Sequence, residues 1–294
     1  MSVKITVPAT SANVGIGYDC LGMAVTLYSH FTFDRCDELV ITGCPEKFRN
    51  ADNLVYRSFL AALNHWGDEP FPVSIHIDSH IPVARGLGSS STCTVAGIMG
   101  AAALTGRIVG RAEAVGIATM MEGHPDNVAP AIMGSLVCSF LPEGKDPQCI
   151  RYEVERGLHF VTVIPPYEVK TEDARKVVPQ EVKLSDAVWQ MGRISGLTRG
   201  LETGNAELIA AACEDRIQEP YRRELIPDYD AVRRICLDGG ALALWISGSG
   251  STLMAATNDG LIAESLRARI AQLFPSFEVY VLDCDPRGVR IEMA

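Results

Sequence analysis

The sequence predicts an α+β fold built from two domains. Its first half mixes strand-like with helix-like segments, and its second half shows a run of helices, a hairpin, a helix and a strand. With 294 residues, the chain can bury two cores of ordinary size. Residues 142–147 are the most polar, Pro/Gly-rich interval in the middle of the chain. We therefore expect the domains to divide near residue 155, into residues 1–155 and 156–294.

The first strand leads into a long loop. Apolar and polar side chains alternate over residues 3–7, which is the period of a half-buried strand. Residues 8–22 are then mostly small, polar or glycine, and they include Asn13 and Asp19. A surface turn could look like this, but it needs fewer residues, and long ordered loops tend to be functional. The amide of Asn13 and the carboxylate of Asp19 would suit a polar or cationic ligand.

Strands and a capped helix follow. Residues 23–42 have the apolar pattern of paired strands with a role in the core. Asp52 or Asn53 caps a helix that runs to about Trp66 and carries its apolar side chains on one face. Capping explains both residues without a further role.

The chain is organised around a strand-to-helix turn at residues 82–92. An alternating strand precedes the turn, and a helix rich in alanine and glycine follows it to Leu104. Glycines on both sides of Leu87 let backbone N–H groups converge without a Cβ in the way. Three serines stand at the helix start, where an anion is favoured and where hydroxyls can also bind Mg²⁺. The turn lacks the Gly-Lys-Ser/Thr of a Walker loop, and a plain turn with a serine cap would look similar.

A polar cluster follows the next expected helix, at residues 111–121. Glu122, His124 and Asp126 fall close together, as in a metal or acid/base cluster. A polar loop with a capping aspartate would have the same spacing. Because apolar residues flank the loop on both sides, we expect its polar groups to face a cleft. A strand at residues 134–140 comes next.

Polar residues of the second half have ordinary structural explanations. Thr171 and Arg175 fit a capped helix start, and an arginine such as Arg222 on an acidic protein is usually solvated. Gly248 belongs to a glycine-rich hairpin. The other elements are expected as strands at 160–165, 241–246, 253–256 and 278–282, and as helices at 185–202, 207–217, 229–237 and 261–273.

Composition excludes several classes of function. The net charge is −10 and no basic stripe is present, so nucleic acid is a poor candidate partner. The nine cysteines include no Cys-x-x-Cys pair, which argues against a zinc site or disulfide framework and suits a reducing cytoplasm. No apolar run approaches the roughly 20 residues of a membrane helix, and the N-terminus does not resemble a signal peptide. We expect a cytoplasmic protein without membrane contact.

Six of these segments resemble motifs of the homoserine kinase family, which belongs to the GHMP kinase superfamily. They are residues 8–22, 82–91, 122–131, 171–175, 219–227 and 247–252. The Pro-x-x-x-Gly-Leu-Gly-Ser-Ser order is shared across the superfamily, whereas Glu-Gly-His-Pro-Asp-Asn-Val-Ala-Pro-Ala is very specific to homoserine kinases. Val14 and Tyr18 are conservative departures from the family pattern. Ser251 replaces the usual proline, which we expect to loosen the hairpin.

The resemblance implies a fold and a reaction. Such kinases join an N-terminal domain like domain 2 of ribosomal protein S5 to a C-terminal ferredoxin-like domain, with the active site between them. The implied reaction is ATP-dependent phosphorylation of L-homoserine to O-phospho-L-homoserine, in threonine biosynthesis. The resemblance also implies Mg²⁺ and a homodimer.

Individual residues receive roles from the same resemblance. ATP is expected at Asn53, Pro82, Val83, Ala84, Arg85, Gly86, Leu87, Gly88, Ser89, Ser90, Ser91 and Thr92. Mg²⁺ is expected at Ser90 and Glu122. Homoserine is expected at Asn13, Asp19, His124, Thr171, Arg175, Arg222 and Gly248, and the catalytic set is Asn13, Ser90, Glu122 and Arg175. Asp19 would bind the ammonium group, Arg175 and Arg222 the carboxylate, and Asn13 the hydroxyl.

The presence of a general base is left open. Mevalonate kinase relatives use an aspartate in the region of Asp126, whereas the resemblance to homoserine kinases suggests that no dedicated base is needed. A buried Asp126 bonded by loop N–H groups would fit the second view. Two other functions also remain: another GHMP kinase, for mevalonate or a sugar, and a non-catalytic nucleotide-binding regulator on the same fold. Retention of both expected metal ligands argues against the regulator.

Overall fold

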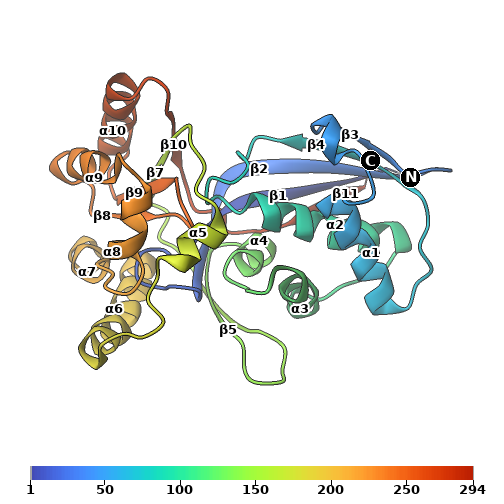
Figure 1. Ribbon diagram of the computed structural model, residues 1–294, viewed down its shortest axis with the longest axis horizontal. Coiled ribbons are helices and arrows are strands. Elements are labelled where there is room, and N and C mark those ends of the chain that lie inside the picture. Colours follow the sequence, from blue (N-terminus) through green and yellow to red (C-terminus); the bar gives the residue numbers. More distant parts are fainter. Residues whose placement is uncertain (1, 294) are drawn as a thin grey trace.

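The computed structural model describes residues 2–293 as two halves placed along the long axis of the molecule (Figure 1). The first half contains a seven-stranded sheet and the second a four-stranded sheet, each covered by helices. The prediction of an α+β fold in two parts is therefore confirmed. None of the described helices is both long enough and apolar enough to cross a membrane.

The first sheet has the strand order β11-β1-β2-β4-β3, and β5 pairs with both β2 and β6. Its strands are β1 (Ser2–Ala12), β2 (Leu21–Arg35), β3 (Val40–Thr42), β4 (Val73–Ser79), β5 (Leu136–Phe140), β6 (Gln148–Tyr152) and β11 (Arg290–Met293). Its helices are α1 (Leu54–Trp66), α2 (Ser89–Thr105), α3 (Arg111–Glu122) and α4 (Val128–Met133), with a short turn η1 (Glu46–Phe48). Helices α2 and α4 pack on the sheet, and α1 and α3 pack on α2.

Helix α2 packs closely because its residues are small. A Cβ on Gly97 would lie 2.2 Å from the carbonyl oxygen of Val55 in α1. A Cβ on Gly100 would lie 2.7 Å from the ring of Phe33 in β2. Neither atom could be added without moving a neighbour. The start of α2 is therefore held in a fixed position relative to α1 and the sheet.

The second sheet is antiparallel, with the order β10-β7-β9-β8. Counted along the chain, this is fourth, first, third, second, the strand order of the expected ferredoxin-like fold. Its strands are β7 (His159–Ile164), β8 (Ala243–Ile246), β9 (Leu253–Thr257) and β10 (Glu278–Leu282). Its helices are α5 (Thr171–Lys176), α6 (Leu184–Thr203), α7 (Ala206–Ala212), α8 (Glu219–Arg222), α9 (Tyr229–Asp238) and α10 (Gly260–Leu273), with a short turn η2 (Arg223–Leu225).

A shared hydrophobic core joins the two halves. Phe160 of β7 and Trp245 of β8 pack in one cluster with Val14 and Leu21 of the first half, and all four side chains are fully buried. The indole N–H of Trp245 also donates a hydrogen bond to Ser11 at the end of β1, over 3.1 Å. The loop between β1 and β2 is therefore not a surface turn, because part of it is buried where the halves meet.

The structure corrects two predicted elements. The expectation of paired strands within residues 23–42 was wrong: β2 is one continuous strand, and β3 pairs in parallel with β4 instead. The helix expected at residues 207–217 ends at Ala212. The carboxylate of Asp215 accepts hydrogen bonds from three backbone N–H groups that follow it, which stabilises a turn in place of further helix.

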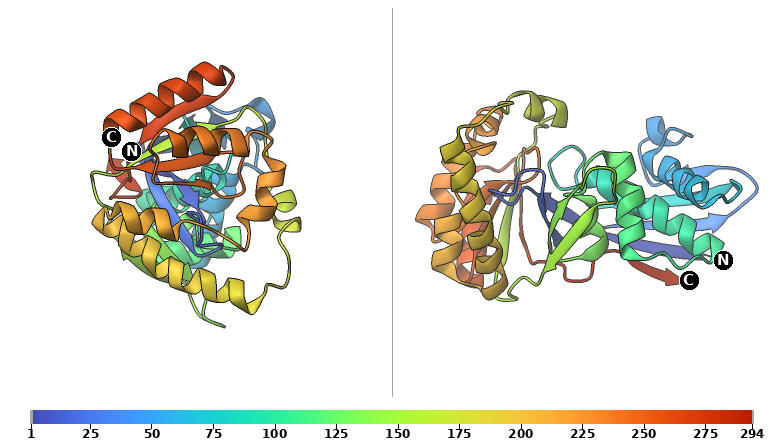
Figure 2. Two further views of the ribbon diagram at one scale, coloured as in Figure 1. Left: turned by 90° about the vertical axis from the view of Figure 1, so that its left-hand side faces the viewer. Right: turned by 90° about the horizontal axis from the view of Figure 1, so that it is seen from below.

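Four elements were not predicted, namely β6, α4, α8 and β11. The chain passes from the first sheet to the second between β6 and β7, on either side of residue 155. Its last strand then returns to pair with β1, and these two strands lie side by side at the far end of the first half (Figure 2). A single division at residue 155 would therefore assign β11 to the second half, although β11 belongs to the sheet of the first half.

Candidate active site

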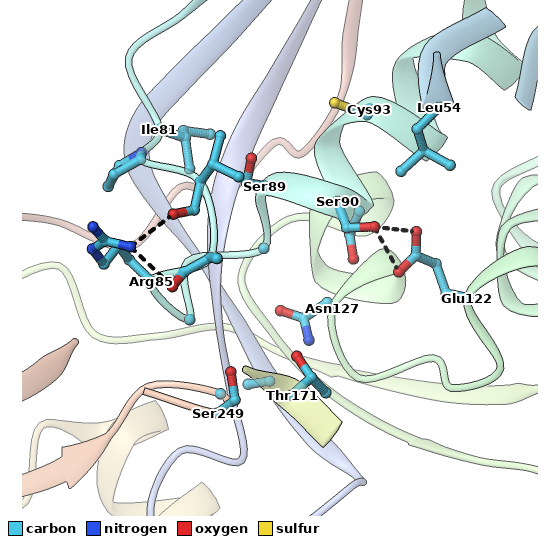
Figure 3. Close-up of a pocket in the computed structure, with 18 of the residues that line it drawn as sticks. Leu54, Ile81, Arg85, Ser89, Ser90, Cys93, Glu122, Asn127, Thr171 and Ser249 are labelled. Carbon is cyan, nitrogen blue, oxygen red and sulfur yellow. Dashed lines mark hydrogen bonds between the residues drawn. The ribbon is translucent and has the colours of Figure 1, made fainter. Parts of the chain in front are cut away.

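A cleft of about 820 Å³ opens where the halves meet, and all six motif segments contribute to its lining (Figure 3). Most of the predicted site residues line it: Asn13, Asp19, Asn53, Pro82, Val83, Ala84, Arg85, Gly86, Gly88, Ser89, Ser90, Ser91, Glu122, His124, Thr171, Arg175, Arg222 and Gly248. Leu87 and Thr92 do not, because each is 1% exposed and buried beneath the turn. Leu87 and Thr92 thus have structural roles as side chains.

The glycine-rich turn is anchored to both halves. The backbone N–H of Thr10 in β1 donates to the carbonyl of Leu87 over 3.1 Å. From the second half, the hydroxyl of Ser247 donates to the carbonyl of Gly86 over 2.6 Å, and the N–H of Thr252 donates to Arg85. These bonds fix the turn at the N-terminal end of α2. They also place the serine hydroxyls along one wall of the cleft.

Arg85 lines the cleft with its backbone, but its guanidinium is committed elsewhere. It donates to the carbonyls of Pro165 and Pro166 over 3.2 and 2.8 Å, and it forms an ion pair with Glu168 at 3.3 Å. All three partners belong to the second half. The Arg85 side chain therefore ties the turn to that half, and its backbone remains the part available to a nucleotide.

Asn53 caps helix α1, as predicted from the sequence. Its side-chain oxygen accepts from the N–H of Val55 at 2.9 Å, and its amide N–H donates to the carbonyl of Phe48 at 2.8 Å. Asn53 therefore uses both ends of its amide in the protein. The cleft beside it is apolar, with Phe48, Leu54 and Ile81 among its lining residues.

Gly88 is required by its neighbours rather than by an approaching ligand. It has a φ of +69°, and a Cβ there would lie 2.0 Å from the hydroxyl of Thr10. That hydroxyl donates to the amide oxygen of Asn127 at 2.8 Å. A side chain on Gly88 would therefore collide with Thr10 and Asn127 of the protein itself.

We expect Gly88→Ala to destabilise the fold more than Gly106→Ala does. Gly106 has a similar φ of +72°, but nothing lies within 4 Å of the added Cβ. The left-handed conformation alone costs about 1–2 kcal/mol, and displacing the Thr10–Asn127 hydrogen bond adds about 1–3 kcal/mol. Urea unfolding of both variants measures the difference. Equal losses of unfolding free energy would contradict this explanation.

Ser90 and Glu122 meet at the cleft wall, as predicted. The Ser90 hydroxyl lies 2.9 and 3.2 Å from the two carboxylate oxygens of Glu122 (Figure 3). Thr94, one turn further along α2, donates to the same carboxylate at 2.6 Å and is fully buried. Hard oxygen donors of this kind suit Mg²⁺, which proteins usually bind through one or two carboxylates together with substrate phosphates. Residues 2–293 contain no cluster of three or more His, Cys, Asp or Glu side chains that could hold a metal by themselves.

Asp19 and Arg175 bind each other across the cleft. The two guanidinium Nη atoms of Arg175 donate to the two carboxylate oxygens of Asp19 over 3.0 and 3.1 Å. This is the bidentate geometry in which arginine–carboxylate pairs are strongest. It links the loop after β1 to helix α5 of the second half. Each residue was predicted to bind a substrate group, and no motif indicated that they would pair with each other.

Asn13 is held next to this ion pair. Its side-chain oxygen accepts from the N–H of Asp19 at 3.1 Å, and its amide nitrogen donates to the carbonyl of Gly248 at 2.8 Å. Asn13 has a φ of +70° and is 2% exposed. Asparagine tolerates that left-handed conformation better than most residues. Within residues 2–293, one N–H of its amide has no acceptor and is available at the cleft.

Arg222 is a buried cation that forms no ion pair with any described residue. It is 3% exposed, and its guanidinium donates to the carbonyls of Ala174 and Gly248 over 3.1 and 2.9 Å. It also lies 4.9 Å from the ring centre of Tyr18. Burial lowers the pKa of Arg222 from its ordinary value. The default expectation of a solvated arginine is wrong, and a buried guanidinium that lines a cleft is suited to bind an anion.

His124 and Asp126 form a second polar pair in the cleft. Their side chains lie 2.5 Å apart, and Asp126 is 3% exposed. The other side-chain contact of Asp126 is the amide of Asn127 at 3.4 Å. Asp126 is therefore buried as expected, but it is bonded by an imidazole rather than by loop N–H groups. That hydrogen bond raises the pKa of His124.

We expect Asp126→Asn to lower the pKa of His124 and to retain measurable activity. Because the folded-state pKa of His124 is raised, its contribution to stability is complete below the pKa of the unfolded chain. It is lost as the pH rises through the folded-state value. The stability advantage of the wild type over Asp126→Asn should therefore shrink as the pH increases past that value. NMR titration of the imidazole measures the pKa directly, and an unchanged pKa in a folded variant would contradict the assignment.

Thr94, Asn127 and Tyr18 contact predicted site residues but were not themselves given a role from the sequence. Thr94 carried a usable signal, because it lies four residues after Ser90 on the same predicted helix. Asn127 lines the cleft from within a recognised motif, and Tyr18 packs beside Arg222.

Ser251, expected to loosen the hairpin, is fully buried and donates to the carbonyl of Tyr167 at 2.6 Å. That hydrogen bond ties the hairpin down.

The fold and the cleft together define a GHMP kinase. The model of the GHMP kinases N terminal domain matches residues 53–135, and that of the GHMP kinases C terminal domain matches residues 197–276. The chain belongs to the homoserine kinase family within this superfamily.

Relatives match over most of the chain. It is 35% identical to a homoserine kinase of Clostridium botulinum over 98% of both proteins. It is 44% identical to a homoserine kinase of a Synechococcus species, over 87% of this chain and 85% of the relative. The crystal structure of homoserine kinase from Cytophaga hutchinsonii superposes with a TM-score of 0.89 at 32% identity, covering 99% of this chain and 97% of that one. A mevalonate kinase structure, 14% identical with a TM-score of 0.75, shares the fold.

Proposed function

We propose that the protein transfers the γ-phosphoryl group of ATP to the side-chain hydroxyl of L-homoserine. The product is O-phospho-L-homoserine, an intermediate of threonine biosynthesis. The proposal rests on the position of Arg222. Its guanidinium is buried, has no ion-pair partner among the described residues, and faces the same cleft as the serine-rich turn. A kinase for an amino-acid acceptor needs such an anion site, whereas a kinase for a neutral sugar does not. The homoserine kinase relatives support the same acceptor.

ATP binding is assigned to the wall formed by the turn and the start of α2. Serine hydroxyls and free N–H groups there would contact the phosphates, and the apolar end beside Asn53 would receive the base. Ser90 and Glu122 would hold Mg²⁺, which when bound neutralises charge on the transferring phosphoryl group. Thr94 keeps the Glu122 carboxylate turned toward Ser90.

Homoserine binding is assigned to the opposite side of the cleft. Arg222 would bind the carboxylate, in preference to Arg175, because both Nη atoms of Arg175 already donate to Asp19. Asp19 keeps free lone pairs that can accept from the ammonium group. The remaining amide N–H of Asn13 would orient the hydroxyl toward the phosphoryl group. Phosphoryl transfer depends mainly on such positioning and on charge neutralisation, so no dedicated base is required.

Two acceptor analogues test the amino-acid site. One is the hydroxy acid that lacks the ammonium group, and the other is the amino alcohol that lacks the carboxylate. Each should be a much poorer acceptor than homoserine when ADP release is followed by a coupled assay. Equal rates for homoserine and the amino alcohol would exclude Arg222 as the carboxylate site.

The homodimer and the cytoplasmic location stay predictions. So do the individual nucleotide contacts of residues 82–92. Another acceptor within the superfamily, such as mevalonate or a sugar, and a regulator without turnover are the competing functions. A kinase for a neutral sugar would leave Arg222 without a carboxylate ligand. Mevalonate has a carboxylate for Arg222 but no ammonium group for Asp19.

A further inference from the structure

Two cysteines lie next to each other directly behind the substrate side of the cleft. Cys20 follows Asp19 in the loop between β1 and β2, and Cys138 lies in β5. Leu21 is the ladder partner of Cys138, and the carbonyl of Cys20 accepts from the N–H of Ser139 over 2.8 Å. Cys20 therefore lies opposite Ser139, one position away from Cys138, and both cysteines pack against the same hydrophobic cluster. Such neighbours fall within the span that a disulfide needs, about 4.4–6.8 Å between Cα atoms.

Both thiols are half-buried rather than sealed in the core. The Cys20 thiol is hydrogen-bonded to Cys138, which raises the pKa of Cys20 and lowers that of Cys138 to about 7. Cys138 is therefore the more acidic thiol of the two, and the thiolate is the reactive form. Most other cysteines differ, because burial raises the pKa of Cys93, Cys236 and Cys284 to about 12.

We propose that Cys20 and Cys138 are a redox-sensitive pair whose oxidation to a disulfide by a peroxide weakens the amino-acid side of the cleft. The Cys138 thiolate attacks one peroxide oxygen, the O–O bond breaks, and hydroxide leaves, which gives a sulfenic acid. The Cys20 sulfur then attacks the Cys138 sulfur, an S–S bond forms, and the hydroxyl group leaves as water with the Cys20 proton. The two thiols lose two electrons in total, and hydrogen peroxide is reduced to two waters once the hydroxide is protonated.

The position of Cys20 explains why a Cys20–Cys138 disulfide would affect the amino-acid side of the cleft. The N–H of Cys20 donates to the carbonyl of Gly17 over 3.0 Å, and the N–H of Asp19 donates to the side chain of Asn13. Asp19 has a φ of +54°, a conformation kept only by the surrounding hydrogen bonds. Formation of the disulfide would draw the Cys20 side chain toward Cys138 and would move this turn. The Asp19 carboxylate would then lose its alignment with Arg175 and with a substrate ammonium group.

Peptide mapping tests the disulfide without reference to activity. The full chain is treated with hydrogen peroxide at neutral pH, the remaining thiols are alkylated, and linked peptides are identified by mass spectrometry. We expect a Cys20–Cys138 link that dithiothreitol reverses and that is missing in Cys20→Ser and Cys138→Ser. Cys36→Ser, which removes a distant half-buried thiol of the first half, is the matched control and should still form the link. Oxidation of other thiols without this link, or a Cys138–Cys149 link in its place, would overturn the proposal.

The effect on the cleft rests on the proposed function and has its own measurement. The KM for homoserine should rise about tenfold on oxidation, equivalent to about 1.4 kcal/mol, while ATP affinity by calorimetry stays unchanged. Cys20→Ser should keep the reduced-state kinetics after peroxide treatment. A link that forms without any change in KM would refute control of the site. A reduced protein that does not phosphorylate homoserine would refute the proposed function and leave the mapping result intact.

Discussion

Arg222→Leu is expected to lower kcat/KM for homoserine by between about 30-fold and a few thousand-fold, because truncating one partner of a buried charge contact costs about 2–5 kcal/mol. The leucine keeps most of the buried volume but cannot donate to a carboxylate. ATP affinity should stay close to that of the wild type, since the guanidinium of Arg222 donates to the carbonyls of Ala174 and Gly248 in the second half and not to the serines of the turn. Steady-state rates and ATP calorimetry on the same variant separate the two effects.

The neighbouring residue provides the control. Arg223→Leu removes an equal charge from a side chain that is 48% exposed and pairs only with Glu224, so its kinetics should match the wild type. Arg222→Leu should also abolish the preference for homoserine over the amino alcohol without a carboxylate. A folded Arg222→Leu that retained this preference would show that another residue binds the carboxylate.

Glu122→Gln should reduce kcat by at least about 100-fold, because a metal ligand supports several kcal/mol of charge stabilisation in phosphoryl transfer. Glutamine has the same shape, and its amide oxygen can still accept from Ser90 and Thr94. The fold should therefore persist while the negative charge is lost. Half-saturation should move to a higher Mg²⁺ concentration, and the KM for homoserine should change less than kcat.

The exposed Glu143 is the matched control for this carboxylate. Glu143→Gln changes the net charge equally on a surface turn far from the cleft lining and should leave the Mg²⁺ dependence unchanged. Manganese binding to the ATP complex, followed by electron paramagnetic resonance, gives a second readout that does not depend on turnover. Unchanged metal affinity in Glu122→Gln would remove Glu122 from the metal site.

Local signals in the sequence predicted much of the fold. Helix α1 begins after Asn53 and α9 ends at Gly239, because capping residues act within one turn. Strand β11 could not be predicted, since residues 290–293 become a strand only through pairing with β1 at the other end of the chain. The helix expected at residues 207–217 failed for a different reason: the Asp215 carboxylate competes for its backbone N–H groups.

The site was predictable as a set of residues but not as a set of contacts. The family resemblance placed Ser90 and Glu122 at one Mg²⁺ site, and their side chains do meet although 32 positions separate them. Neither the motifs nor the resemblance indicated that Asp19 and Arg175, 156 positions apart, would form an ion pair with each other. They also could not show that Arg222 is buried, because burial depends on packing between the two halves.

Identification of the phosphorylated product tests the central claim most directly. The wild-type protein is incubated with ATP and Mg²⁺ in one mixture that contains homoserine, mevalonate and galactose at equal concentration, and the products are identified by mass spectrometry and phosphorus NMR. We predict O-phospho-L-homoserine as the dominant product, with the phosphate on the side-chain oxygen. Phosphorylation of mevalonate or galactose in its place, or ATP binding without any product, would contradict the account.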